Sequence, residues 1–96
     1  MAVFLLAAID NIKRDGYRAY EEGGFSSVAK FGVEPVAVSD DIKVLEGTAP
    51  GTRIVLMKFK DQAALDAWYN SPEYQGVIPI RQANSDTKFL VTFEGL

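Results

Sequence analysis

The sequence has 96 residues, of which 48% are hydrophobic and 24% are charged, and its net charge is −3 at pH 7. These proportions are typical of a globular chain rather than a disordered one, and the length predicts a single domain over residues 1–96. Lys and Arg are scattered, and no apolar stretch approaches the roughly 20 residues of a membrane span, so we expect a soluble protein that binds neither nucleic acid nor membrane.

Apolar patterning predicts the first strand and the first helix. Residues 2–9 form a continuous apolar run that ends at Asp10, which is typical of a strand buried on both faces. Apolar and aromatic residues then recur at spacings of three and four over residues 12–31, and Gly32 follows as a C-terminal stop, so a helix is expected there. Gly23-Gly24 lies inside this helix and predicts a kink or a close packing contact.

The middle of the chain alternates between strand and turn patterns. Residues 36–45 are expected to form a bent or paired element, and Pro35 places it at the edge of the sheet. Residues 48–51 have turn chemistry, and residues 53–60 alternate as a strand.

A helix that breaks and restarts is predicted next. Asp61 is suited to cap its first segment, while Ser71 as a second N-cap and Pro72 at the following position predict the restart. Pro79 is expected to remove a hydrogen bond from the restarted helix. Residues 87–94 alternate as the last strand.

The order β-α-β-β-α-β predicts an α+β, ferredoxin-like fold, with a four-stranded antiparallel sheet and two helices on one face. Two helices leave the second face of the sheet uncovered, although the first strand and much of the third are apolar on both faces. Another copy of the chain is the economical cover, so we expect a homodimer whose sheets pack face to face. The alternative is a monomer with a partly exposed apolar sheet.

The residue types that are absent exclude several kinds of chemistry. The chain has no histidine and no cysteine, which excludes a Ser-His-Asp triad, a histidine-ligated haem, a zinc site and a disulfide framework. Nucleotide-binding glycine motifs are also missing. We therefore predict no cofactor and no metal, and the absence of cysteines and of a signal-peptide pattern fits a cytoplasmic protein.

Aromatic and charged residues near the ends of the predicted elements are the candidate site. Such a fold can open a pocket between helices and sheet, and pockets combine aromatic walls with a few convergent polar groups. An arginine could hold an anionic group, and Asp10 or a tyrosine could transfer a proton. Asp10 is the catalytic candidate, and the ligand-binding candidates are Tyr17, Tyr20, Arg53, Trp68, Tyr69, Tyr74 and Arg81.

Each candidate also has an ordinary structural interpretation. The tyrosines and Trp68 at helical spacing are most simply core residues. Asp10 before a helix is more often an N-cap than a catalyst. Arg81 near a helix C-terminus is explained by the helix dipole, or by pairing with Glu73 or Asp86.

The segment WYNSPEYQ at positions 68–75, followed by Arg81, resembles the signature of a family known only as a domain of unknown function, DUF1330. Phe31-Gly32, the string VLEG at positions 44–47, and Arg53 agree with the same pattern. The resemblance implies a dimeric α/β-barrel protein with a cleft beside the first helix, and it brings no established reaction.

Three functional hypotheses follow from these residues. The first is a homodimeric protein that binds a small anionic molecule in the cleft, either as a binding protein alone or as an enzyme of simple acid-base type. The second is a non-catalytic dimerisation module whose aromatic cluster is packing alone. The third and weakest, a cofactor-independent monooxygenase, rests only on the resemblance to the superfamily.

Overall fold

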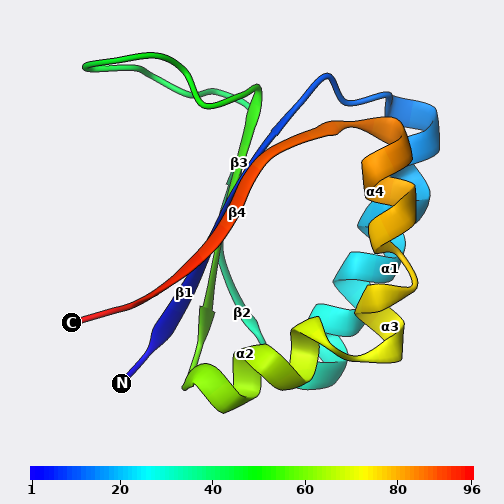
Figure 1. Cartoon of the computed structure of the whole chain (residues 1–96), viewed down its shortest axis with the longest axis vertical. Coiled ribbons are helices and arrows are strands. Elements are labelled where there is room, and N and C mark those ends of the chain that lie inside the picture. Colours follow the sequence, from blue (N-terminus) through cyan, green and yellow to red (C-terminus); the bar gives the residue numbers. More distant parts are fainter.

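The computed structural model describes residues 1–96, and its elements follow the predicted order (Figure 1). The strands are β1 (Val3–Asp10), β2 (Glu34–Ser39), β3 (Arg53–Phe59) and β4 (Asp86–Glu94). The helices are α1 (Arg14–Phe31), α2 (Gln62–Tyr69), α3 (Pro72–Gln75) and α4 (Ile78–Asn84). None of these helices combines the length and the apolar character that crossing a membrane requires.

The four strands form one sheet in the order β2-β3-β1-β4, and every neighbouring pair is antiparallel. Each βαβ unit therefore has a strand of the other unit between its own two strands, which is the split arrangement of the ferredoxin-like fold. Figure 1 shows all four helices on the same side of the sheet. The predicted fold class is confirmed, and Pro35 does lie on an edge strand, next to a bulge.

The core lies between the sheet and the helices. Leu5 of β1 and Trp68 of α2 are each 1% exposed, and Met57 and Phe59 of β3 are buried in the same cluster. The other face of the sheet is also apolar but has no helix over it. Its large apolar side chains follow from the strand register and are Phe4, Leu6, Ile54, Leu56, Phe89, Val91 and Phe93, and the charged Lys58 and Glu34 lie on the same face beside Phe4. Val91 and Phe93 are 44% and 46% exposed.

The structure corrects the start of the first helix. The helix begins at Arg14 rather than residue 12, because Asn11 adopts a left-handed φ of 50° and turns the chain out of the strand. Asp10 is the last residue of β1 and pairs with Asp86 across the sheet, while Lys13 occupies the N-cap position. The capping interpretation of Asp10 was therefore wrong. At the other end, Gly32 stops the helix with φ 65°, as predicted.

The paired glycines of α1 make the close contact that the sequence predicted. A Cβ on Gly23 would lie 2.5 Å from Cγ1 of Val77, whereas a Cβ on Gly24 would meet no atom within 4 Å. Gly23 thus lets α1 approach the segment between α3 and α4. Gly24 leaves open space beside the helix.

Residues 40–52 differ from the prediction. The segment around Ile42 to Leu45 forms no strand, because it makes no ladder pairing with β3 or any other strand. Residues 40–52, called the arm below, project beyond the uncovered face of the sheet (Figure 1). The base of the arm is fastened to the body by the hydrogen bond from the Thr52 amide to the Ile9 carbonyl, with N···O 3.0 Å. At the tip, Leu45 is 96% exposed.

The helical restart is confirmed, but it occurs twice. The Asp61 carboxylate accepts from the Ala64 amide at 2.8 Å, and the Ser71 hydroxyl accepts from the Tyr74 amide at 3.2 Å. Pro79 lies in the first turn of a third segment, α4, where the amide it lacks would have had no helical partner. The expected loss of a hydrogen bond was therefore wrong, and the predicted second helix is three short ones.

Candidate functional site

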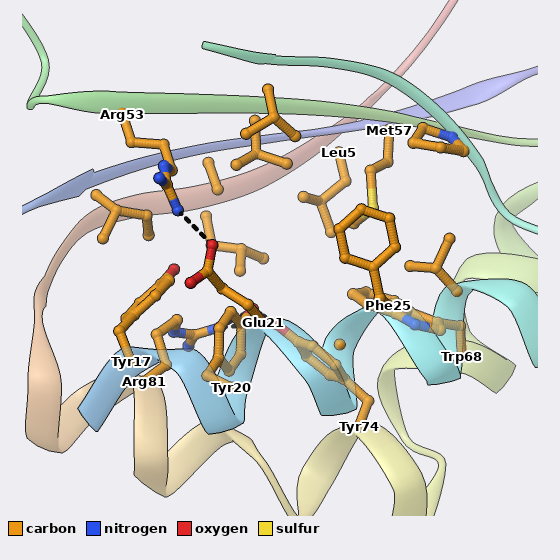
Figure 2. Close-up of a pocket in the computed structure, with 18 residues that line it drawn as sticks. Leu5, Tyr17, Tyr20, Glu21, Phe25, Arg53, Met57, Trp68, Tyr74 and Arg81 are labelled. Carbon is orange, nitrogen blue, oxygen red and sulfur yellow. Dashed lines mark hydrogen bonds and ion pairs between the residues drawn. The ribbon is translucent and has the colours of Figure 1, made fainter. Parts of the chain in front are cut away.

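A cavity of about 130 Å³ lies between the inner face of the sheet and the helices. Its walls are mainly apolar, with Leu5, Ala7, Ile9, Val55, Met57 and Leu90 on the sheet side and aromatic residues on the helix side. The exposed Phe25 of α1 projects toward Met57 at one end (Figure 2). The fold therefore places a partly open, mainly apolar space beside the first helix.

Tyr20, Tyr74 and Arg81 form the polar cluster of this cavity, although they come from three different helices. The two phenol oxygens are 2.6 Å apart. Nη1 of Arg81 donates to the Tyr74 oxygen at 2.7 Å and to the Tyr20 oxygen at 3.5 Å. Figure 2 shows the guanidinium of Arg81 between the rings of Tyr17 and Tyr20.

Arg81 is a buried cation without an anion. It is 5% exposed and forms none of the ion pairs in the structure. Both of its side-chain hydrogen bonds leave from Nη1, and Nε is buried without a partner. The predicted pairing with Glu73 or Asp86 was wrong, because Glu73 pairs with Lys30 and the Asp86 carboxylate accepts from Asn11. A buried charge and an unsatisfied donor are both costly, so this residue needs an explanation.

The neighbouring phenols do not supply the missing negative charge. Burial raises the pKa of Tyr17 to about 12, with a further contribution from Tyr20, and burial likewise raises the pKa of Tyr74 well above its ordinary value. Both side chains therefore remain neutral at physiological pH. They can donate or accept hydrogen bonds, but as neutral phenols they cannot act as general bases.

Arg53, in contrast, is fully neutralised. Its Nε and Nη2 bind the two carboxylate oxygens of Asp40 at 2.7 and 3.0 Å, and its Nη1 donates to Glu21 at 3.2 Å (Figure 2). The same contact with Arg53 lowers the pKa of Asp40. Its guanidinium carbon also lies 5.8 Å from the ring centroid of Tyr17. Arg53 joins the sheet, α1 and the base of the arm, and its charge is already balanced by two carboxylates.

Trp68 is both a core residue and part of the cavity wall. Its indole Nε1 donates to the Ser27 hydroxyl at 3.0 Å, and that hydroxyl donates in turn to the Gly24 carbonyl at 2.7 Å. The ring centroids of Trp68 and Tyr74 are 4.0 Å apart. The contrast that the sequence suggested between core packing and pocket lining disappears here, since one face of the cluster packs and another borders the cavity.

Six of the eight candidate residues from the sequence line the cavity: Tyr17, Tyr20, Arg53, Trp68, Tyr74 and Arg81. Asp10 and Tyr69 do not line it. Tyr69 packs against Trp68 and Tyr74, with ring centroids 6.3 and 5.8 Å away.

Sequence reasoning missed Glu21 and Phe25, which line the cavity from α1. The spacing held a signal, because these residues follow Tyr17 by four and eight positions on one helix face. No group of three or more acidic side chains is arranged to hold a metal ion.

The comparison with sequence families decides the classification. The profile of the family described as "Domain of unknown function (DUF1330)" matches residues 2–96. The chain belongs to the DUF1330 family. No curated protein matches this DUF1330 chain in sequence.

Solved structures with this fold include three informative examples. RPA0582 from Rhodopseudomonas palustris, a protein of unknown function, is 18% identical with a TM-score of 0.76, and the match covers 99% of this chain and 82% of that one. HapK from Hahella chejuensis is 15% identical with a TM-score of 0.63, covering 100% and 93%. SnoaB from Streptomyces nogalater, a cofactor-independent oxygenase, is 11% identical with a TM-score of 0.58, covering 99% and 92%. At these identities the likeness establishes the ferredoxin-like fold and nothing about activity.

Proposed function

We propose that this DUF1330 protein binds a small anionic molecule in the cavity between helices and sheet. The observation that carries the proposal is Arg81, a buried guanidinium at the cavity wall that has no carboxylate partner and an unsatisfied Nε. Buried charges in proteins are ordinarily paired, and a ligand anion would complete this one.

The site favours binding over acid-base catalysis. Glu21 is the only carboxylate that lines the cavity, and Arg53 already holds it. The buried tyrosines keep their protons, so they act as hydrogen-bond donors toward a ligand rather than as bases. The monooxygenase hypothesis has only the fold likeness to SnoaB in its favour.

Binding is tested with a panel of compact organic anions: benzoate, hexanoate, benzenesulfonate and phenylphosphonate. At least one is expected to raise the thermal unfolding midpoint and to change the fluorescence of Trp68, the only tryptophan, which borders the cavity. Gly24→Leu is expected to abolish both effects, because a side chain there enters open space at the cavity wall.

Gly24→Ala is the matched control, since it changes the same helical position but adds a single carbon. It should keep most of the binding and the same fold. If no anion of the panel shifts the midpoint, or if Gly24→Leu binds as well as the natural protein, the cavity is not a ligand site and a packing role explains the aromatic cluster.

We further propose that the protein is a homodimer with the uncovered sheet faces packed together. The support is the mainly apolar outer face, on which Phe4 and Phe93 stack with ring centroids 5.8 Å apart. The arm projects on this same side and carries the exposed Val44 and Leu45 (Figure 1). A second copy related by a two-fold axis would cover the face and meet the arm at once.

Leu56→Lys tests the dimer. Leu56 lies in the middle of the outer face, opposite Leu6, so the substitution should reduce the molar mass in light scattering from that of two chains to that of one. Phe25→Lys is the control, because it introduces the same charge at an exposed apolar residue on the helix side and should leave the dimer intact. A dimer that survives Leu56→Lys would place the interface elsewhere.

A further inference from the structure

The two arginines of the cavity indicate the net charge of the ligand. Arg53 has two carboxylate partners, so its charge is already balanced by Asp40 and Glu21. Arg81 has none. One uncompensated positive charge therefore faces this space. A monoanion would neutralise it, whereas a dianion would leave a second negative charge buried without a partner.

The unused donors of Arg81 indicate which anionic group the ligand carries. Nη1 of Arg81 is occupied by the two phenol oxygens, which leaves Nη2 and the buried Nε without hydrogen bonds. The edge that these two nitrogens form presents two parallel N–H donors, the arrangement that a planar carboxylate accepts through both oxygens. The phenol groups hold the guanidinium in place, so little side-chain freedom is lost when an anion binds.

The volume and the lining of the cavity indicate the size and the chemical character of the rest of the ligand. A volume of about 130 Å³ is close to that of a protein cavity that holds one benzene ring. Trp68, Tyr74 and Tyr20 offer ring faces and edges, which favour a flat aromatic group. Apart from the cluster around Arg81, the Arg53–Glu21 pair and the hydroxyl of Tyr17, the lining is apolar, so it gives few partners for further polar substituents.

We propose, building on the proposed function, that the ligand is a monocarboxylate carrying a single aromatic ring. Its carboxylate binds Nη2 of Arg81 and, after a small movement of the side chains that cover it, the buried Nε, and its ring packs against Trp68 and Tyr74. Tyr20 and Tyr74 act as positioning residues that orient the guanidinium.

The test compares benzoate with three relatives at pH 8, by titration of Trp68 fluorescence on the full chain. Benzamide keeps the shape but lacks the charge, 2-naphthoate adds a second ring, and phenylphosphonate is a dianion. Benzoate is expected to bind at least about tenfold more tightly than each of them. Benzamide lacks the charge that pairs with Arg81, 2-naphthoate is too large for the cavity, and phenylphosphonate carries a second negative charge that has no partner. Equal binding of benzoate and benzamide would overturn the role of the charge, and equal binding of 2-naphthoate would overturn the single ring.

Two substitutions at Arg81 make the assignment specific. Arg81→Met removes the charge, and Arg81→Lys keeps the charge but loses the two-donor edge; both should weaken benzoate binding at least about tenfold. Arg18→Met removes one charge from the exposed surface of α1 and should bind benzoate like the natural protein. Undiminished benzoate binding by either Arg81 variant would overturn the proposal, and circular dichroism confirms that each variant is folded.

Failure of this proposal is distinguishable from failure of the proposed function. If phenylphosphonate or hexanoate binds in a manner that Gly24→Leu abolishes while benzoate does not, the cavity binds anions but the ligand class is wrong. If no anion binds, both proposals fail together.

Discussion

Replacing Trp68 by alanine is expected to lower the free energy of unfolding by about 3 to 5 kcal/mol, the range for truncating a buried aromatic side chain. Trp68 is 1% exposed and its ring lies between those of Phe59 and Tyr74, with centroids 5.5 and 4.0 Å away. The loss of the ring would join the space it occupies to the existing cavity. Ser27 would still donate to the Gly24 carbonyl, so the unfilled volume dominates the effect.

Chemical denaturation followed by circular dichroism measures this change, since the variant has no tryptophan. Tyr69→Ala is the control, because Tyr69 is the adjacent aromatic residue, also packs against Tyr74 and is only partly buried. Tyr69→Ala should lower the free energy of unfolding clearly less than Trp68→Ala does. A loss below about 1 kcal/mol for Trp68→Ala, as is usual for surface positions, would show that α2 is not held to the sheet by this residue.

Arg81→Met is expected to have the opposite sign and to raise the free energy of unfolding by about 1 to 2 kcal/mol in the absence of ligand. The guanidinium is buried without an anion, and methionine can fill much of the same volume. The hydroxyl groups of Tyr20 and Tyr74 would keep their mutual hydrogen bond. The same denaturation experiment measures the gain.

Arg53→Met serves as the comparison, because it removes an arginine that does have partners. The carboxylates of Asp40 and Glu21 would lose their cation, so this variant should be less stable than the natural protein. If Arg81→Met proved as destabilising as Arg53→Met, Arg81 would be a structural residue, and the argument for a ligand anion would lose its basis.

A residue that weakens the folded state and lines a cavity is typical of a functional site. Natural proteins retain such groups where binding or catalysis requires them, and replacing them commonly exchanges function for stability. The pairing of these two outcomes, higher stability and lost anion binding in Arg81→Met, would therefore be more informative than either measurement alone.

Local patterns account for the predictions that were confirmed. Ser71 and Pro72 predicted the helical restart because capping depends on neighbours within one turn. Gly32 predicted the end of α1 for the same reason. The predictions that failed concerned segments whose structure depends on distant partners. Ile42 to Leu45 have the composition of a strand, but no strand pairs with them in this chain.

The candidate site shows the same division. Helical spacing brought Tyr17, Tyr20 and Trp68 to the inner side, and helical and strand periodicity are sufficient for that inference. Spacing could not distinguish the two arginines, however. Arg53 is neutralised by Glu21, 32 positions away, while Arg81 reaches Tyr20, 61 positions away, and no acid.

The sequence by itself therefore determined the order of the strands and helices, the caps at Gly32, Asp61 and Ser71, and the mainly apolar character of both sheet faces, because these properties depend on neighbouring residues and on periodicity. Only the tertiary structure decided which arginine is free, which carboxylate lines the cavity and how large the cavity is. Those properties depend on contacts between residues far apart in the chain, and on volumes that packing leaves unfilled, neither of which local spacing encodes.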